Sequence, residues 1–227
     1  MKIGIISDTH NLLRPEVIQN LRGCEYILHA GDISSREILE QLGQIAPVKA
    51  VRGNNDKEWA EHLPQFLDFE LGGLRICMTH RKKDLPTDLT PYDLVICGHT
   101  HQYAANWQES AGKRRTLVFN PGSCGPRRFL QPITMAILKI DPDGWNVEQI
   151  NIPNAAREKA PKFDSGDICS QIEMVVRDTE KGLSADAIAK KHRLDPDLVE
   201  QIVRLYVTHP GVTVDGIMTK MGLLGKL

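Results

Sequence analysis

Five short polar clusters in the N-terminal half of the chain each follow directly behind a strand-like apolar run. They are Asp8-Thr9-His10, Gly31-Asp32, Gly53-Asn54-Asn55-Asp56, His80 and Gly98-His99-Thr100-His101. In open α/β sheets the carboxyl ends of neighbouring strands meet at one edge, so loops that are far apart in the sequence become neighbours there. The i, i+2 spacing of Asp8 with His10, and of His99 with His101, lets both side chains of a pair leave a strand end toward one side. The clusters therefore predict a sheet whose edge gathers these side chains into one site.

The order of the apolar runs predicts the fold class. Strand-like runs alternate with helical runs in the first part of the chain: strands at 2–7, 26–30 and 48–51, and helices at 15–21 and 34–45. Strand-like runs then follow one another at 68–71, 75–78, 94–97, 116–119, 134–140 and 146–152, with Asp143-Gly144 marking a hairpin. This order predicts an α/β fold with a two-sheet β-sandwich core flanked by helices.

The composition changes after about residue 153, and the C-terminal part is predicted to be a small all-α module. Residues 156–166 have no apolar period, which indicates a linker between a domain at 1–155 and a module at 167–227. Three or four short helices are predicted there, from the segments 167–181, 184–192, 195–207 and 213–221. The middle two resemble a helix-turn-helix, but Asp195, Asp197 and Glu200 lie where DNA phosphates would come. We therefore favour protein interaction or homo-oligomerisation over nucleic-acid binding for this module.

Charge and cysteine content restrict the partners and the compartment. The 28 basic and 29 acidic residues give a formal net charge of −1, which offers no global attraction to nucleic acid or to an anionic membrane. We recognise neither a signal peptide at the N-terminus nor an apolar segment of membrane-spanning length. The five cysteines are scattered without a CxxC pair, so reduced thiols are expected. The expectation is a cytoplasmic protein with no membrane partner.

The donor types in the clusters favour a metal site. Imidazole and carboxylate without thiolate suit Mn²⁺, Fe or Zn²⁺ rather than Ca²⁺. Asn54 adds a neutral oxygen, so two divalent cations beside Asp8 and Asp32 would keep a net positive charge that attracts a phosphoryl oxygen. The alternative is turn chemistry, because Asp and Asn behind strands often satisfy loop backbone groups. The complete ordered set favours the metal site.

The ordered series DTH, GD, GNND, TH and GHTH resembles the calcineurin-like metallophosphoesterases over roughly residues 1–150. The HAGD at 29–32 and the NPGSCGPR at 120–127 resemble the small bacterial and archaeal phosphodiesterases within that superfamily, whose fold is shared by a retromer sorting subunit. The resemblance implies an αββα metallophosphoesterase fold. It further implies that one metal is held by Asp8, His10 and His101 and the other by Asn54, His80 and His99, with Asp32 bridging the two.

What the resemblance implies for function is hydrolysis of phosphate esters, phosphodiesters above all, by a metal-bridging hydroxide. The expected cofactors are two divalent metal ions, with Mn²⁺ first and Fe, Zn²⁺ or Ni²⁺ as alternatives, and the expected partner is a phosphate-ester substrate. Catalytic roles are expected for four residues: Asp32, Asn54, His80 and Asn55.

Two positions depart from the family pattern. Many relatives have a His at the third position of the GNND tetrad, thought to protonate the leaving group, where this chain has Asn55. An amide cannot act as a general acid, so activated aryl esters are expected to react better than alkyl esters.

The small phosphodiesterases often read HGH where this chain reads His80-Arg81-Lys82-Lys83. These cations either grip phosphate or form a solvated loop, and the solvated loop is favoured.

Several neighbouring residues are expected to be structural. Asp56 is expected to cap a helix that begins near Lys57. For His29, a hydrogen bond to a carboxylate or to a ligand competes evenly with plain core packing. Asn120 and Ser123 are interpreted as structural rather than substrate-binding.

The rival interpretation is a regulatory or scaffold protein that kept the fold with a degraded site and uses the helical tail to bind a protein or DNA partner. Degraded sites lose ligands, whereas all seven predicted ligand positions are occupied here by suitable side chains. The enzyme is therefore the favoured interpretation.

Overall fold

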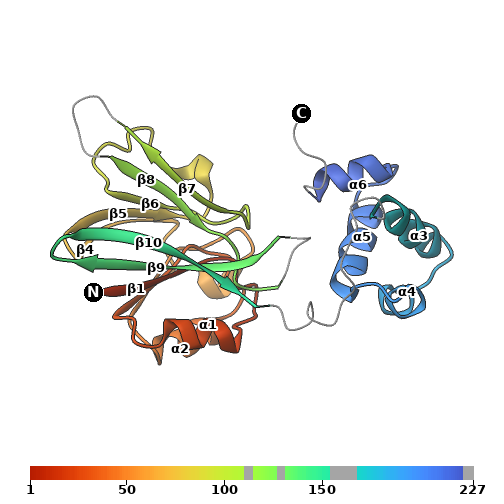
Figure 1. Cartoon of the computed structure of the whole chain (residues 1–227), viewed down its shortest axis with the longest axis horizontal. Helices are drawn as coiled ribbons and strands as arrows, with labels where there is room; N and C mark the ends of the chain where they lie inside the picture. The colour runs from red at the N-terminus through yellow and green to blue at the C-terminus, as the bar shows by residue number, and fades with distance from the viewer. Residues whose placement is uncertain (110–114, 127–130, 154–167, 222–227) are drawn as a thin grey trace. The chain divides into compact units, whose positions relative to one another are not determined.

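The computed structural model describes residues 1–109, 115–126, 131–153 and 168–221, and these fall into two compact units (Figure 1). The first, the two-sheet unit, contains residues 1–126 and 132–153, and the second contains the C-terminal helices. The predicted linker at 156–166 and the last residues of the predicted module, 222–227, lie outside the described residues.

The first sheet has the strand order β10-β9-β1-β2-β3. Its three N-terminal strands are parallel, and β9 and β10 add an antiparallel hairpin to β1. Two helices, α1 and α2, connect the parallel strands. The elements are β1 (Lys2–Ile6), α1 (Pro15–Leu21), β2 (Tyr26–His29), α2 (Arg36–Gly43), β3 (Val48–Ala50), β9 (Ile133–Asp141) and β10 (Gly144–Ile152).

The second sheet has the order β4-β5-β6-β8-β7, in which β5, β6 and β8 are parallel and the two outer strands antiparallel. Of two 3₁₀ helices, η1 lies in the segment that leads from β3 to this sheet, and η2 lies between β5 and β6. The elements are η1 (Glu58–Ala60), β4 (Phe66–Leu71), β5 (Leu74–Thr79), η2 (Lys82–Asp84), β6 (Leu94–Ile96), β7 (Tyr103–Gln108) and β8 (Thr116–Pro121).

Alternating side chains build separate cores on the two faces of each sheet. In β1, Ile3 and Ile5 pack between the sheets, whereas Ile6 faces the helices α1 and α2. In β5, Ile76 points to the inter-sheet core, whereas Cys77 packs under the segment that contains Leu89 on the outer face. The predicted two-sheet α/β sandwich flanked by helices is confirmed.

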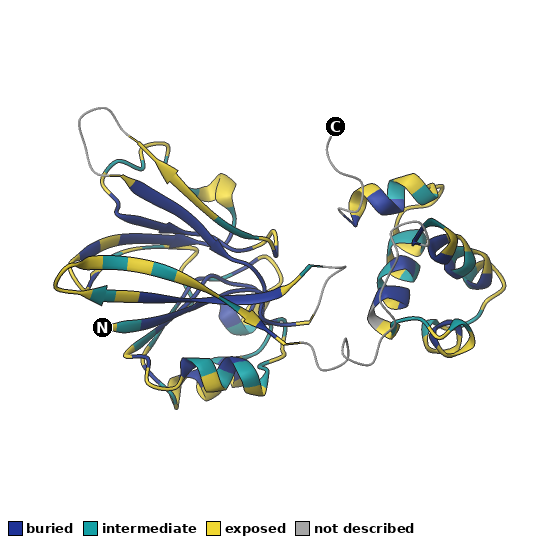
Figure 2. Cartoon of the chain, viewed as in Figure 1, coloured by how far each residue is buried: buried dark blue, intermediate teal, exposed yellow. Residues whose placement is uncertain are grey.

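One strand was not predicted. β7 is half-buried at its start and exposed from Ala105 onward, and it forms an edge of the second sheet beside the fully buried β8 (Figure 2). An exposed edge strand needs no alternation of apolar residues, so the sequence gives no period-2 signal there. Trp107 of β7 packs against Trp145 of β10, with ring centroids 5.4 Å apart, and thereby joins the edges of the two sheets.

The helical unit contains α3 (Ile168–Glu180), α4 (Ala185–His192), α5 (Pro196–Thr208) and α6 (Val214–Lys220), close to the predicted spans. Ser184 and Thr213 cap α4 and α6 by accepting hydrogen bonds from backbone N–H groups of the first turn. None of the helices in the described part of the chain has the length and apolar character needed to span a membrane.

Asp56 ties together two loops that carry predicted site residues. Its carboxylate accepts hydrogen bonds from the backbone N–H groups of Ile33, Ser34 and Gly53, at 2.9, 2.7 and 2.8 Å. The expected helix cap at Asp56 is therefore wrong, because the carboxylate binds the loop behind β2 instead of the turn that follows Lys57. Since the side chain is only 3% exposed, these three bonds fix the loop behind β3 against the loop behind β2.

Replacing Asp56 by Ala is expected to lower the free energy of unfolding by about 2–4 kcal/mol, because three backbone donors lose their acceptor in a buried site. Urea denaturation followed by near-UV circular dichroism measures the change. Asp143→Ala, at an exposed hairpin position, serves as the control and is expected to shift stability by less than about 0.5 kcal/mol. Equal losses in the two variants would contradict the role of Asp56.

Candidate metal centre

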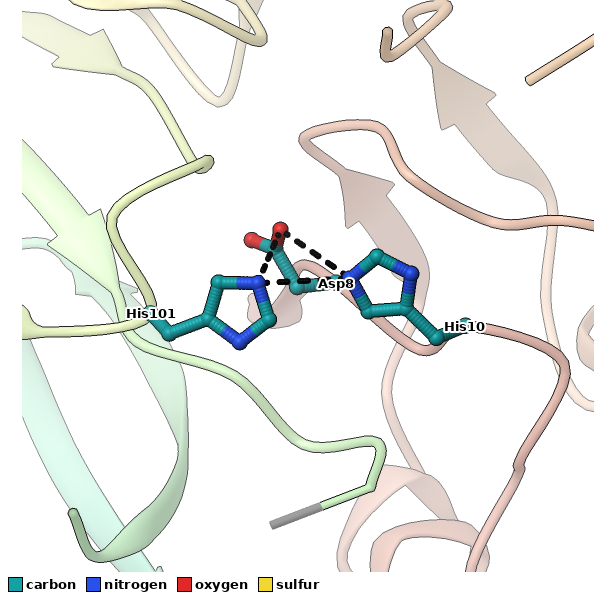
Figure 3. A group of neighbouring side chains, drawn as sticks. All are labelled: Asp8, His10 and His101. Atoms are coloured by element: carbon teal, nitrogen blue, oxygen red, sulfur yellow. Dashed lines mark hydrogen bonds and ion pairs between the residues drawn. The ribbon is translucent and has the colours of Figure 1, made fainter. Parts of the chain in front are cut away.

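The first donor group consists of Asp8, His10 and His101, which come from the loops behind β1 and β6 (Figure 3). The Nε2 atom of His101 lies 3.0 Å from Asp8 Oδ1 and 3.2 Å from His10 Nε2. His10 Nε2 is 3.7 Å from the same carboxylate oxygen. Two nitrogens and one oxygen therefore face a common point.

The second donor group consists of Asp32, His80 and His99, whose ligand atoms lie within 4.8 Å of one another. Asn54 joins it, since its Oδ1 is 3.1 Å from His80 Nε2. Asp32 Oδ2 is 3.3 Å from His80 Nε2 and 3.8 Å from His10 Nε2, so this oxygen lies beside both donor groups. The structure thus brings all seven predicted ligand side chains together.

The spacing in the first group fits a shared cation. Nitrogens bound at about 2.0–2.1 Å to one tetrahedral ion stand about 3.3 Å apart, close to the observed separation of the two imidazoles. Asp8 Oδ1 is buried and accepts no hydrogen bond from the described residues, although it faces two Nε2 atoms. A buried carboxylate oxygen without a donor is costly, and a cation would satisfy it. These residues could hold a divalent metal.

Hydrogen bonds fix the orientation of the second group. His80 Nδ1 lies 2.8 Å from the carbonyl oxygen of Ala30. Because a carbonyl only accepts, Nδ1 carries a proton, which leaves Nε2 as the ring atom that could bind a metal. Asn55 donates to both oxygens of Asp32, from its backbone N–H at 2.8 Å and from Nδ2 at 2.7 Å. Asn55 therefore orients the carboxylate that lies between the two groups.

The charges of the site suit cation binding. Burial raises the pKa of Asp8, but the imidazoles of His10 and His101 outweigh burial, so the pKa lies well below its ordinary range. Burial also raises the pKa of Asp32, but the hydrogen bond and the charge of His80, together with the backbone N–H of Asn55, more than offset it. Both carboxyls are consequently ionised at neutral pH and present negative charge to the site.

Five of the seven donors stand on left-handed backbone. The φ angles are 55° at Asp8, 43° at His10, 55° at Asp32, 73° at His99 and 60° at His101. The predicted strand-like alternation of the i, i+2 pairs is therefore wrong, since these residues lie in loops beyond the strand ends and turn inward through a different conformation. Left-handed non-glycine residues are uncommon, and their clustering supports a functional site.

Sequence reasoning missed the groups that support these loops. Ser7, which directly follows β1, donates to Asp8 Oδ2 at 2.6 Å, and a single Ser at a strand end gives no signal of that role. Ser123 donates to the carbonyl oxygen of Asp8, and Asn120 donates to that of Gly98, so both are structural as expected. The sequence signal for Asn120 and Ser123 is their place in the glycine-containing segment 120–125, where polar side chains often bind loop backbone groups.

His29 is fully buried and bonded to Thr9 rather than to a carboxylate or a predicted ligand. The backbone N–H of Gly31 donates to its Nδ1, so Nε2 carries the proton and donates to Thr9 Oγ1 at 3.0 Å. Burial lowers the pKa of His29 to about 4, which keeps the ring neutral. This neutral hydrogen bond connects β2 to the loop that carries the first donor group.

The site is open on one side. Asp8, Asp32, His80 and His101 are buried, whereas His99 and Asn54 are exposed to solvent. A ligand can therefore approach the donor atoms from the side of the exposed residues, while the carboxylates remain inside the protein.

Comparison with known proteins gives relatives for the two-sheet unit. Residues 1–143 match the calcineurin-like phosphoesterase superfamily domain. A probable metallophosphoesterase of Methanothermobacter thermautotrophicus is 35% identical over 165 residues, which covers 66% of this chain and 92% of that protein. A phosphodiesterase of Methanocaldococcus jannaschii is 31% identical over 145 residues, covering 55% and 84% of the two chains. The crystal structure of Vps29 from Chaetomium thermophilum shares the fold, with a TM-score of 0.51 and 20% identity over 67% of this chain and 97% of that one.

Metal-stripped protein is expected to gain about 2.7 kcal/mol of stability at a Mn²⁺ concentration 100 times the dissociation constant, because only the folded site binds the ion. Isothermal titration calorimetry is expected to give two ions per chain. His101→Ala is expected to lose one of them, whereas His62→Ala, at an exposed position away from both groups, is expected to keep both. An unchanged stoichiometry in His101→Ala would remove this residue from the ligand set.

Proposed function

Because this chain belongs to the calcineurin-like phosphoesterase superfamily, we propose that it hydrolyses phosphate esters, phosphodiesters above all, with two divalent cations held by the seven donor side chains. The observation that carries the proposal is the position of Asp32 Oδ2, within 4 Å of a histidine nitrogen in each donor group. Bound divalent cations of this kind lower the pKa of water and stabilise the attacking and leaving oxygens of an in-line displacement. Mn²⁺ is the proposed metal, with Fe, Zn²⁺ or Ni²⁺ as alternatives.

The protein's own side chains set the charge and direction of the site. Asp8 and Asp32 are the carboxylates of the ligand set, and the remaining ligands are four imidazoles and the Asn54 amide, all of which bind a metal in neutral form. With two divalent cations bound, this composition leaves a net positive charge at the site, which attracts a phosphoryl oxygen. His99 and Asn54, at the exposed side, are the ligands nearest to an arriving substrate.

Asn55 is proposed to act as a positioning residue for Asp32 rather than as an acid. Its side-chain amide donates to Asp32 Oδ2, and an amide has no proton to give a leaving group. The leaving oxygen must therefore depart without a protein acid at this position. Esters with good leaving groups are the substrates on which such a site works fastest.

Asp32→Ala is expected to reduce hydrolysis of bis-p-nitrophenyl phosphate in the presence of Mn²⁺ by roughly 10³-fold or more, because both donor groups lose the carboxylate beside them. Circular dichroism checks that the fold is retained, and Asp143→Ala is the control with expected wild-type turnover. Activity of Asp32→Ala at wild-type metal content would refute the assignment. A fully metal-loaded wild type without turnover would favour the non-catalytic scaffold.

The absence of an acid at position 55 predicts a steep dependence of rate on the leaving group. Dialkyl phosphodiesters are expected to react far more slowly than p-nitrophenyl diesters. Asn55→His is expected to reduce this difference in rate by about 10²-fold, within the range typical of general acid catalysis. The ratio of kcat/KM values for the two ester types is the measurement. Asn106→His, on the exposed part of β7, is expected to leave the ratio unchanged. An alkyl diester that reacts as fast as the aryl diester in the wild type would show that Asn55 is not limiting.

A further inference from the structure

A cavity of about 290 Å³ opens beside the second donor group, on the side of Asn54 and His80. Its wall is built from the loop behind β3, the residue before β4, the end of β5 and the segment of η2. Its volume lies near the lower limit of small-molecule sites, so it has room for one small group attached to a substrate.

The wall of this cavity carries two guanidinium groups, those of Arg52 and Arg81. Of the two carboxylates in the wall, Asp56 is occupied by three backbone N–H donors. Asp84 holds Arg81 through one contact, from Nε at 2.7 Å, in an ion pair whose partners are 37% and 40% exposed. Exposed pairs of this kind contribute little stability, so the Arg81 guanidinium can engage a stronger anion. The cavity therefore suits an anionic group.

Among the described residues that line the cavity there is no Phe, Tyr or Trp, so it offers no aromatic face to a nucleobase. A planar guanidinium matches the geometry of phosphate oxygens and binds them by two parallel hydrogen bonds. We infer that this cavity binds a second phosphate group of the substrate while the scissile phosphate lies at the metal centre. The inference rests on the proposed function and narrows it to small phosphate esters that carry a further phosphate.

Arg81 differs from the two lysines that follow it. Lys82 and Lys83 are exposed, whereas Arg81 is half-buried and lines the cavity. The exposure of the lysines agrees with the favoured solvated loop, whereas Arg81 is the cation whose place in the cavity wall suits the alternative, a grip on phosphate. Arg81 directly follows His80 of the second donor group, and both residues line the cavity, so a ligand bound by Arg81 lies beside that group.

The test compares two ligands that differ by one phosphate, thymidine 5′-monophosphate and thymidine 3′,5′-bisphosphate. Isothermal titration calorimetry on the full chain at saturating Mn²⁺ is expected to give about tenfold tighter binding of the bisphosphate, as one charge-assisted contact provides. Arg81→Gln is expected to bind both ligands equally. Lys83→Gln, which removes a neighbouring charge outside the cavity, is expected to keep the tenfold preference.

Equal affinities in the wild type, or a preference that survives in Arg81→Gln, would overturn the inference. Turnover of bis-p-nitrophenyl phosphate, which has no second phosphate, is measured on the same samples. If metal-loaded wild type shows no turnover of this diester, the proposed function is overturned. The ratio of the dissociation constants of the two thymidine ligands still decides whether the cavity selects a second phosphate.

Discussion

The site depends on keeping two carboxylates charged inside the protein. Asp8 and Asp32 are buried, and burial alone favours the neutral form of each. Neighbouring imidazoles reverse that preference, and for Asp32 the backbone N–H of Asn55 helps. An isolated buried charge is costly, so the arrangement is stable only when loops from several strands deliver its partners together.

The sandwich delivers those partners because its parallel strands end near one another. Backbone hydrogen bonds continue the pairing of β1 and β2 past the strand ends, from Asp8 N to the carbonyl oxygen of Gly31 and from His10 N to that of Asp32. The left-handed conformation at five donor positions costs about 1–3 kcal/mol each, and such strain persists only where surrounding bonds over-determine it. The carboxylate of Asp56 and the hydroxyl of Ser123 provide bonds of this kind.

The parts of this molecule that the sequence predicts are those where a side chain's neighbours in sequence are also its neighbours in space. Strands with apolar alternation and helix caps such as Ser184 satisfy that condition, whereas the site, which joins distant loops, was predicted from the ordered series of polar clusters. The strand β7 does not satisfy the condition, because an exposed edge needs no apolar pattern. Asp56 does not either, because two of its donors lie 23 and 22 residues earlier, on another loop. Nor does Arg81, whose place in a cavity wall depends on how η2 packs beside the loop behind β3.

The contact between Trp107 and Trp145 has a practical consequence. The three tryptophans of the chain, Trp59, Trp107 and Trp145, all belong to the two-sheet unit, and residues 154–227 contain none. Indole fluorescence therefore reports the two-sheet unit alone, whereas the far-UV dichroism of the peptide backbone includes the helices of both units. The chain carries an intrinsic optical label with which the melting of one unit can be followed separately from that of the other.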